Sequence, residues 1–446
     1  MSTHKLSSDN YQVPEGYKKT DVGVIPENWE VSYLYEIAKK VTDGEHATPK
    51  RTTEGYYLLS ARNIFNGFID LTDVDFVGVS EYQRIRKRCN PEAGDVLISC
   101  SGTIGRVSVL PIGIDCVMVR SAALVKPDVN KIKNYFLQYI LLHRNGQEQI
   151  AKKINQGAQA NLFINNIETL KIPLPPLPEQ SAIARALSDA DTLIAALDKQ
   201  LAKKRHIKTA TMQQLLTGKK RLPGFGEGKG YKKTDVGVIP EDWEILKLRE
   251  VIKSFQNGYA FSAQGYVSSG VPIITMAQIG LDGTFKFSDE CVNFWSVYDF
   301  NKLQQYHVEN GDVIISMTDV TPEKNLIGRM TIVRSNITAL LNQRVGLLRV
   351  DINKVNSVFL TALSNQRRWR EYSRAIASLG VQANIGTKDI KEGKLILPPI
   401  REQNAIAQVL TDIDTEIAAL EKRRAKTQAI KQGMMQELLT GRTRLV

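Results

Sequence analysis

The chain has 446 residues, more than one hydrophobic core normally serves. Its 42% hydrophobic and 24% charged residues are typical of globular domains and exclude collagen-like and disordered classes. Lysine and arginine number 59 against 47 acidic residues, and the net charge of +12 favours a polyanionic partner such as nucleic acid.

Signals for membranes and disulfides are weak. No apolar run approaches the ~20 residues that span a bilayer, and the polar first ten residues lack the apolar segment of a signal peptide. The four cysteines form no C-x-x-C pair and are too sparse for a disulfide framework. We therefore expect a cytoplasmic protein with no membrane partner.

Two near-repeats organise the chain. Residues 16–31 recur at 230–245, an offset of 214, and residues 175–222 recur at 398–445, an offset of 223. The segments between the repeats diverge, and the second is nine residues longer because the offsets differ by nine. The sequence predicts a repeated frame that carries two variable inserts.

The first insert is predicted to be mixed α and β. Short apolar runs predict strands at 57–60, 95–99 and 106–110, and a helix is expected at 134–142. Polar groups on the turns can bond to base edges, and a basic run can contact phosphates. The candidate DNA-binding residues here are Arg62, Asn63, Arg84, Arg86, Lys87, Arg88, Ser101, Thr103, Arg106, Gln159 and Asn161.

The repeat at 175–222 is predicted to form a long helix, as is its copy at 398–445. Apolar residues alternate in steps of four and three after a Pro-rich start, and Gly218 and Gly441 are placed to cap the ends. We expect the helices to pair, irregularly where Lys204 and Arg424 occupy apolar positions, although packing on separate domains is the alternative. The candidate spacer and partner-docking residues are Glu179, Gln180, Ile183, Leu187, Ile194, Leu197, Glu402, Gln403, Ile406, Leu410, Ile417 and Leu420.

The second insert repeats the order of the first. Strands are expected at 273–276, 312–316 and 330–333, followed by a helix over 357–372. This parallel order predicts one fold for both inserts, with different surfaces. The candidate DNA-binding residues here are Gln278, Ser316, Thr318, Arg329, Arg367, Arg368, Arg370, Gln382 and Asn384.

Motifs for catalysis are missing from the sequence. There is no G-x-x-x-x-G-K-[ST] phosphate loop, no Asn-Pro-Pro-aromatic tetrad, and no histidine spacing typical of a metal site. Two E-x-K triplets, at Glu227 and Glu392, leave a metal-dependent nuclease as an alternative that would need a second converging carboxylate. We predict no catalytic and no metal-ligating residue.

The duplicated motifs resemble a known family. PPLPEQ at 175–180, PPIREQ at 398–403 and GDVLISCSGTIGR at 94–106 are similar to the specificity subunit of type I restriction-modification systems. The second insert departs from this pattern at 316–319 and has additional residues at 321–325. The resemblance implies an α+β fold with two globular mixed α/β target-recognition domains, separated by a pair of long antiparallel coiled-coil helices with pseudo-twofold symmetry.

The resemblance also implies partners. Double-stranded DNA with a split target, two copies of a methyltransferase (modification) subunit and a restriction/translocase subunit would bind this chain. The partner subunits would hold S-adenosylmethionine, ATP and Mg, and this chain would hold no cofactor. A stand-alone DNA-binding coiled-coil adaptor without a methylase partner is the alternative function.

Four regions follow from the repeats and the resemblance. The first frame segment and target-recognition domain are expected over 1–174, and the first spacer helix over 175–222. A linker, the frame repeat and the second target-recognition domain are expected over 223–397, and the second spacer helix over 398–446.

Overall fold

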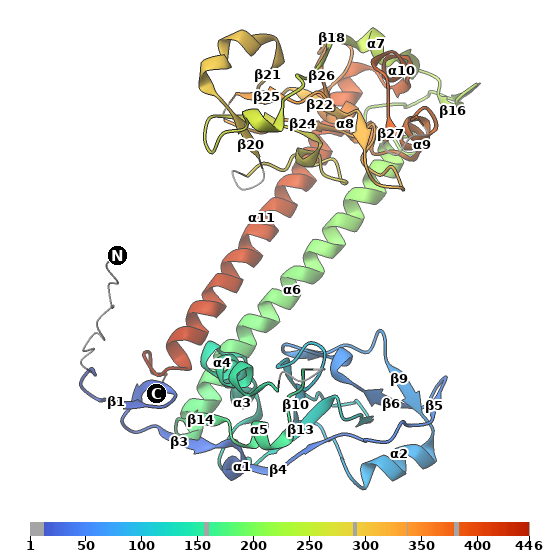
Figure 1. Cartoon of the computed structure of the whole chain (residues 1–446). Helices are drawn as coiled ribbons and strands as arrows, with labels where there is room; N and C mark the ends of the chain where they lie inside the picture. The colour runs from blue at the N-terminus through green and yellow to red at the C-terminus, as the bar shows by residue number, and fades with distance from the viewer. Residues whose placement is uncertain (1–12, 156–159, 289–291, 337, 379–382, 446) are drawn as a thin grey trace. The chain divides into compact units, whose positions relative to one another are not determined.

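The computed structural model describes residues 13–155, 160–288, 292–336, 338–378 and 383–445. The chain divides into two compact units, each mixing sheets and helices as predicted (Figure 1). Unit 1 consists of Met1–Lys199 and Lys422–Val446, and unit 2 of Gln200–Glu421. Each unit therefore contains one half of each long helical repeat.

Unit 1 opens with its frame. The hairpin of β1 (Tyr17–Thr20) and β2 (Gly23–Pro26) leads to β3 (Glu30–Tyr33), which pairs with β14 (Lys171–Leu174) at the end of the insert. The first insert thus begins and ends on neighbouring strands, so it can vary without disturbing the frame.

Two four-stranded sheets form the first insert, joined by short helices. One sheet has the order β11 (Val107–Val109), β10 (Val96–Ser99), β13 (Ala122–Pro127), β4 (Ala38–Asp43). The other has the order β12 (Cys116–Met118), β6 (Tyr56–Leu59), β9 (Asp75–Val77), β5 (Arg51–Thr52). The remaining elements are α1 (Leu34–Ile37), η1 (Ala61–Asn63), β7 (Ile64–Phe65), β8 (Phe68–Ile69), α2 (Val79–Arg86), α3 (Asn134–Leu142), α4 (Arg144–Lys153) and α5 (Ile164–Glu168).

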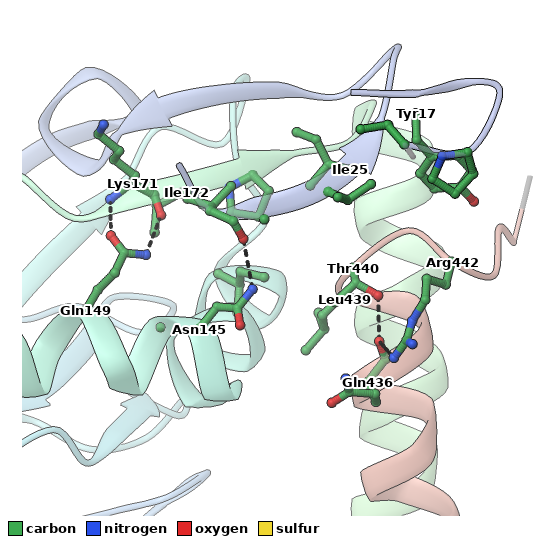
Figure 2. Close-up of a pocket in the computed structure, with 18 residues that line it drawn as sticks. Tyr17, Ile25, Asn145, Gln149, Lys171, Ile172, Gln436, Leu439, Thr440 and Arg442 are labelled. Carbon is green, nitrogen blue, oxygen red and sulfur yellow. Dashed lines mark hydrogen bonds between the residues drawn. The ribbon is translucent and has the colours of Figure 1, made fainter. Parts of the chain in front are cut away.

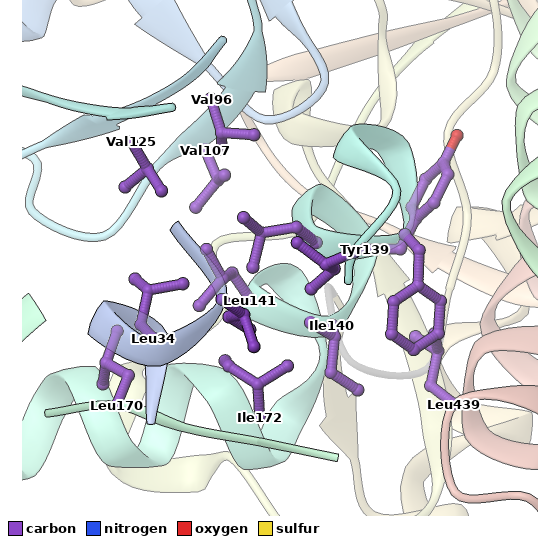
Figure 3. Packing of buried hydrophobic residues seen from close by; sticks show 14 of the residues in the cluster. Leu34, Val96, Val107, Val125, Tyr139, Ile140, Leu141, Leu170, Ile172 and Leu439 are labelled. Atoms are coloured by element: carbon purple, nitrogen blue, oxygen red, sulfur yellow. The ribbon is translucent and has the colours of Figure 1, made fainter. Parts of the chain in front are cut away.

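The main core of unit 1 lies between the first sheet and the helices. Every residue of β10 is buried, and Figure 3 shows Val96 and Val107 facing Leu141 of α3 across this core. The core continues to Leu439, the residue that follows the second long helix, α11 (Ile400–Leu438). The C-terminal segment is therefore part of unit 1 through apolar burial, the main favourable term in folding.

Unit 2 repeats the frame pairings, the first sheet and three strands of the second sheet, which confirms the shared fold predicted from the parallel order. Its frame has β15 (Tyr231–Thr234), β16 (Gly237–Pro240), β17 (Glu244–Lys247) and β28 (Lys394–Leu397). One sheet has the order β18 (Ile252–Asn257), β26 (Val345–Val350), β22 (Val313–Ser316), β24 (Met330–Ile332). The other has the order β20 (Asn293–Trp295), β19 (Val271–Ile274), β25 (Ala339–Leu341), β21 (His307–Val308), and a short pair joins β23 (Thr318–Asp319) to β27 (Ala383–Asn384).

The helices of unit 2 correct one prediction. The expected single helix over 357–372 is two helices, α8 (Ser357–Ser364) and α9 (Arg367–Ala375). The chain is extended at Gln366 (φ −71°, ψ 145°), which ends the helical hydrogen bonding. The other short elements are α7 (Leu248–Val251), η2 (Ala263–Gly265), η3 (Met276–Gln278), η5 (Val297–Asp299), η6 (Asn301–Tyr306) and α10 (Thr387–Glu392).

The two long helices, α6 (Leu177–Leu215) and α11 (Ile400–Leu438), have 39 residues each. In unit 1, Arg424 pairs with Asp198 of α6, and in unit 2, Lys204 pairs with Glu416 of α11. The helices therefore pair antiparallel, as predicted, and the two cations that interrupt the apolar seam form ion pairs across it. Gly218 (φ 71°) and Gly441 (φ 70°) adopt the left-handed conformation after the helix ends.

Candidate nucleic-acid interface

Four strand ends meet at one edge of unit 1. β12 runs parallel to β6, and the antiparallel pairs β10–β13 and β13–β4 bring the ends of β10 and β4 to the same side. Backbone hydrogen bonds join the loops there, including Arg120 N to Glu45 O (3.0 Å) and Cys100 N to Ser121 O (2.8 Å). We call residues 43–48, 60–63, 99–106 and 119–121 the loop edge of unit 1.

Several predicted side chains gather on this edge. Ser101 forms a backbone bridge with Asn161, and Thr103 is exposed beside it. Arg62 is exposed and pairs with Asp75 at 3.0 Å. The sequence therefore identified turns that the fold brings together from positions about 100 residues apart.

Unit 2 has an equivalent loop edge, made by residues 257–262, 275–278, 316–329 and 342–344. Thr318 Oγ1 donates to Asn384 Oδ1 at 2.9 Å, in the place of the bridge between Ser101 and Asn161. The recurrence of polar turns predicted from the sequence is thus a recurrence in space. Two candidates, Gln159 and Gln382, lie outside the described residues.

Four candidates on these edges are buried. Asn63 is 1% exposed, and its amide accepts from Ser60 N (3.0 Å) and donates to Asp73 O (2.9 Å). Gln278, the corresponding residue of unit 2, and Ser316 and Thr318 are also buried. The side chains of Asn63, Gln278 and Ser316 satisfy backbone groups of the turns, and Thr318 bonds to the side chain of Asn384, because a buried polar group without a partner is costly. The base contacts of these four residues stay a prediction.

The basic run of unit 1 lies on and after α2, beside the loop edge. Arg84 pairs with Glu81 and Glu45, and Arg88 pairs with Asp43 at 2.7 Å. Arg86 lies over the ring of Tyr82, with 5.2 Å between its guanidinium carbon and the ring centroid. Lys87 is exposed and, within the described part of the chain, has no ion pair or side-chain hydrogen bond. Phosphate contact by this run remains a prediction that best suits Lys87.

The basic run of unit 2 is mostly structural. Arg370 is 5% exposed and donates to the carbonyls of Asn325 (2.8 Å) and Lys324 (3.0 Å). Burial, together with the charges of Arg329 and Arg374, lowers the pKa of Arg370 to about 10. Its guanidinium holds the loop that carries the additional residues 321–325, and the phosphate contact expected of it stays a prediction.

The other cations of these runs differ in exposure. Arg367 is exposed and pairs only with Glu371 among the described residues, whereas Arg368 donates to the carbonyl of Val236 at 2.5 Å. Arg106 lies 4.4 Å from the ring centroid of Phe65, and its counterpart Arg329 donates to Asn325 O at 2.6 Å. Arg367 and Arg368 are both exposed and Arg329 is half-buried, so direct DNA contact is sterically open to the first two and restricted for Arg329.

The Glu-Gln pair of each proline motif is buried and forms hydrogen bonds with several segments of the frame. Glu179 is 0% exposed, and its carboxylate accepts from Trp29 Nε1 (3.1 Å) and from Arg444. Gln180 accepts from Lys133 N at 2.9 Å and donates to Pro175 O at 2.9 Å. We call Trp29, Glu179, Arg444 and Asn28 the frame junction of unit 1.

The frame junction of unit 2 consists of Trp243, Glu402, Arg221 and Asp242. Glu402 is 0% exposed and accepts from Trp243 Nε1 (3.2 Å) and from Arg221 (2.6 Å). Gln403 repeats the bonds of Gln180, accepting from Asn356 N at 3.0 Å. All four motif residues are buried and assemble the frame at the start of the two long helices, and a part for them in partner docking stays a prediction.

The predicted apolar seam residues of the two long helices differ in how far they are buried. Five pack into the units or against the paired helix, each no more than 2% exposed: Ile183, Leu187, Leu197, Ile406 and Leu410. Ile194, Ile417 and Leu420 are only partly covered. A groove of about 600 Å³ runs beside Leu420 in unit 2 and is also lined by Ile207 and Ala419.

A larger cavity, about 650 Å³, lies in unit 1 away from the loop edge (Figure 2). It is bounded by the β1–β2 hairpin, α4, β14 and the end of α11. Asn145 donates to the carbonyl of Val22 at 2.9 Å, and Gln149 exchanges two hydrogen bonds with the backbone of Lys171. Its polar groups are engaged in frame contacts, so it shows no constellation for catalysis.

Catalytic chemistry finds no support among the described residues. No group of three His, Cys, Asp or Glu side chains in that part of the chain could hold a metal ion. Glu392 pairs with Lys247 and Arg249, and Glu227 accepts from Gly224 N, so the E-x-K triplets form local structural contacts. Burial raises the pKa of Cys89 to about 11 and those of Cys100 and Cys116 to about 12, typical of inert thiols. No helix within the described ranges is long and apolar enough to cross a membrane.

Three exposed side chains on the loop edges escaped the sequence prediction. Arg120, Gln343 and Arg344 occupy the turns that follow β12 and β25. The turns carry no glycine, proline or basic run that would mark them, and only the strand pairing places them at the edge.

Comparisons with known proteins agree with this architecture. The model of the type I restriction modification DNA specificity domain matches residues 26–204 and 240–432. A Methanocaldococcus jannaschii chain described as the specificity subunit of the type I restriction enzyme MjaX is 31% identical over 97% of both chains. The MjaVIII specificity subunit of the same organism is 28% identical over 97% of this chain and 96% of its own length.

A solved structure shares the fold. The type I restriction-modification S subunit from M. genitalium matches with a TM-score of 0.58 at 15% identity, covering 92% of this chain and 96% of its own. At this identity the likeness concerns the fold alone.

Proposed function

Since this chain belongs to the type I restriction-modification DNA specificity family and is a non-catalytic subunit that recognises DNA sequence, we propose that each unit reads one half of a bipartite target. Unit 1 would contact one half-site through its loop edge, and unit 2 the other. The target is double-stranded DNA, and the cytoplasm is the expected site of action.

The observation that carries this proposal is the duplication of the loop edge with changed side chains. Both edges are built by the same strand pairings, yet the residues on them differ. A shared scaffold with different polar tips is suited to reading two different sequences, because base identity is read by side-chain groups on a positioned backbone.

Exchange of one insert tests this division. Replacing residues 32–171 with the insert of a relative should change one half-site of the methylated sequence and leave the other intact. The measurement is genome-wide mapping of methylated adenines in cells that also express the modification subunit. A change in both half-sites would show that the units do not read independently.

The paired helices are proposed to set the gap between half-sites. Adding four residues to both α6 and α11 lengthens the pair by about 6 Å, which corresponds to up to two base pairs of rise. The same methylation mapping should show a longer gap with both half-sites retained. An unchanged gap would refute the role of the helices as a ruler.

The frame is proposed to scaffold the catalytic partners. Its two near-identical segments give a reason for two copies of one modification subunit, joined by a restriction/translocase subunit. Those partners would supply S-adenosylmethionine binding, ATP and Mg. Co-purification with a modification subunit tests this point, because a stand-alone adaptor would purify alone.

A further inference from the structure

One turn has the same backbone in both units and different side chains at its tip. In unit 1, Ala122 N donates to Val119 O (3.0 Å), which closes a turn around Arg120 and Ser121. In unit 2, Val345 N donates to Asn342 O (2.9 Å), around Gln343 and Arg344. We call these the tip turns.

The neighbouring strands hold both tip turns in the same way. Arg120 N donates to Glu45 O at 3.0 Å, and Gln343 N donates to Tyr259 O at 2.9 Å. Cys100 N donates to Ser121 O (2.8 Å), and in unit 2 Met317 N donates to Arg344 O (3.0 Å). Arg120 therefore corresponds to Gln343, and Ser121 to Arg344.

Glycine makes this close packing of the backbone possible. A Cβ on Gly44 would lie 2.3 Å from Met118 O, and a Cβ on Gly258 would lie 2.1 Å from Asn342 O. Both distances are below any van der Waals contact, so the loops before the tip turns need glycine. Each tip turn is thus held by backbone hydrogen bonds to two neighbouring segments, and a residue that must hold a fixed geometry needs such a support.

The tip side chains are not used inside the protein. Arg120, Gln343 and Arg344 are exposed, and within the residues that the structure describes none has an ion pair or a side-chain hydrogen bond. Other arginines on or beside the loop edge of unit 1 differ, because Arg62, Arg84 and Arg88 pair with carboxylates and Arg106 lies over the ring of Phe65. Ser121 is tied down, since its hydroxyl accepts from Ala61 N at 3.1 Å.

We infer that Arg120 and Gln343 are specificity-determining residues that read one base pair in each half-site; this inference rests on the proposed function. A guanidinium donates two hydrogen bonds to guanine O6 and N7, and a glutamine amide pairs with adenine N6 and N7. Arg120 selects guanine in the half-site of unit 1, and Gln343 selects adenine in that of unit 2. Arg344 adds a second donor group next to Gln343.

Exchange of the two side chains is the test. Arg120→Gln and Gln343→Arg are made separately in the full chain, in complex with the modification subunit, and methylated adenines are mapped. Arg120→Gln should replace or relax one guanine of the half-site of unit 1, and Gln343→Arg one adenine of the other. Arg334→Gln, an exposed change beyond the end of β24, is the control and should leave the sequence unchanged.

Binding competition gives a second readout if methylation is lost. Duplexes carrying the wild-type sequence compete with duplexes changed at one base pair. Each variant should lose about tenfold to a hundredfold of the discrimination at its own position. Unchanged discrimination in both variants overturns the inference while a bipartite wild-type sequence upholds the proposed function. A wild-type complex that modifies no bipartite sequence would instead refute the proposed function, and with it the inference.

Discussion

The two frame junctions share a design but differ in how the chain reaches them. In unit 2, Arg221 and Asp242 lie on one continuous segment that joins α6 to the second frame repeat, and they form a bidentate pair at 2.9 and 3.0 Å. In unit 1, the same roles fall to Arg444 near the C-terminus and Asn28 near the N-terminus, joined by one bond of 3.1 Å. In unit 1 the arginine and its outer partner are therefore far apart in the sequence and are brought together by non-covalent contacts.

The two frame junctions also differ in the number of carboxylates that face their arginine. Arg221 faces two carboxylates, Glu402 and Asp242, and its side chain is 12% exposed. Arg444 faces Glu179 and the neutral Asn28, and its side chain is 31% exposed. Both junctions thus contain a buried glutamate that bonds to a tryptophan and an arginine, but the outer residue is an acid, Asp242, in unit 2 and the neutral Asn28 in unit 1. We expect unit 2 to depend more strongly on its arginine.

The largest effect should come from Arg221→Met. It leaves the buried carboxylate of Glu402 without its counter-charge, and breaking such a pair costs about 3–5 kcal/mol. Hydrogen exchange of peptides from the start of α11 measures the lost protection. Lys219→Met, two residues away and exposed, is the matched control. A loss below ~1 kcal/mol would show that the buried pair does not hold unit 2 together.

Arg444→Met tests the same contact in unit 1 and should cost less, about 2 kcal/mol, because the arginine is more exposed and has one acid partner. The reduced protection should be confined to the start of α6 and to the first frame segment. Arg442→Met, which breaks the exposed pair with Glu437 and a hydrogen bond of 3.5 Å to Gln436 O, serves as control. An effect equal to that of Arg221→Met would refute the asymmetry.

A reciprocal exchange of the outer residues should sharpen the comparison. Asp242→Asn removes a carboxylate whose pKa the hydrogen bond from Arg221 holds below its usual range, and should destabilise unit 2 by about 1–2 kcal/mol. Asn28→Asp gives Arg444 a second acid and should stabilise unit 1 by about 0.5 kcal/mol. Opposite signs in the two units are the expected result of urea unfolding followed by hydrogen exchange. Equal signs would show that the outer acid is not what distinguishes the junctions.

The repeats revealed this frame from the sequence, but not the role of its residues. Duplicated PPLPEQ and PPIREQ segments predicted long paired helices, and the helices confirm it. Glu179 stands at a helix start, where an acid is expected to be exposed, and its buried carboxylate bonds to Trp29 and Arg444, which are 150 and 265 residues away. Such distant partners leave no local pattern.

The sequence predicted where the polar turns lie, but it did not predict which of their side chains are exposed. The turn at 60–63 was correctly placed, yet Asn63 bonds backward into its own loop and Arg62 faces outward. A turn residue can satisfy its own backbone or reach a ligand, and both uses favour the same residue types. Arg120 escaped notice because the order of the strands, and not the residues around it, puts it on the edge.

The smallest expected effect is a pH dependence of stability in unit 1 that unit 2 lacks at the corresponding position. His143 is buried at the start of α4, and burial, aided by Arg442 and Arg144, lowers its pKa below the ordinary value of 6.5, whereas unit 2 has Gln366 at the corresponding position. The unfolded chain then binds the proton more readily, so the contribution of the neutral ring is full above pH ~6.5 and is lost as pH falls below it toward the lowered value. Hydrogen exchange, corrected for intrinsic rates, should show α4 of unit 1 losing protection between pH 7.5 and 5.5, and His143→Gln should reduce that loss without changing α9. If the variant and the wild type respond alike, another group governs the pH dependence of unit 1.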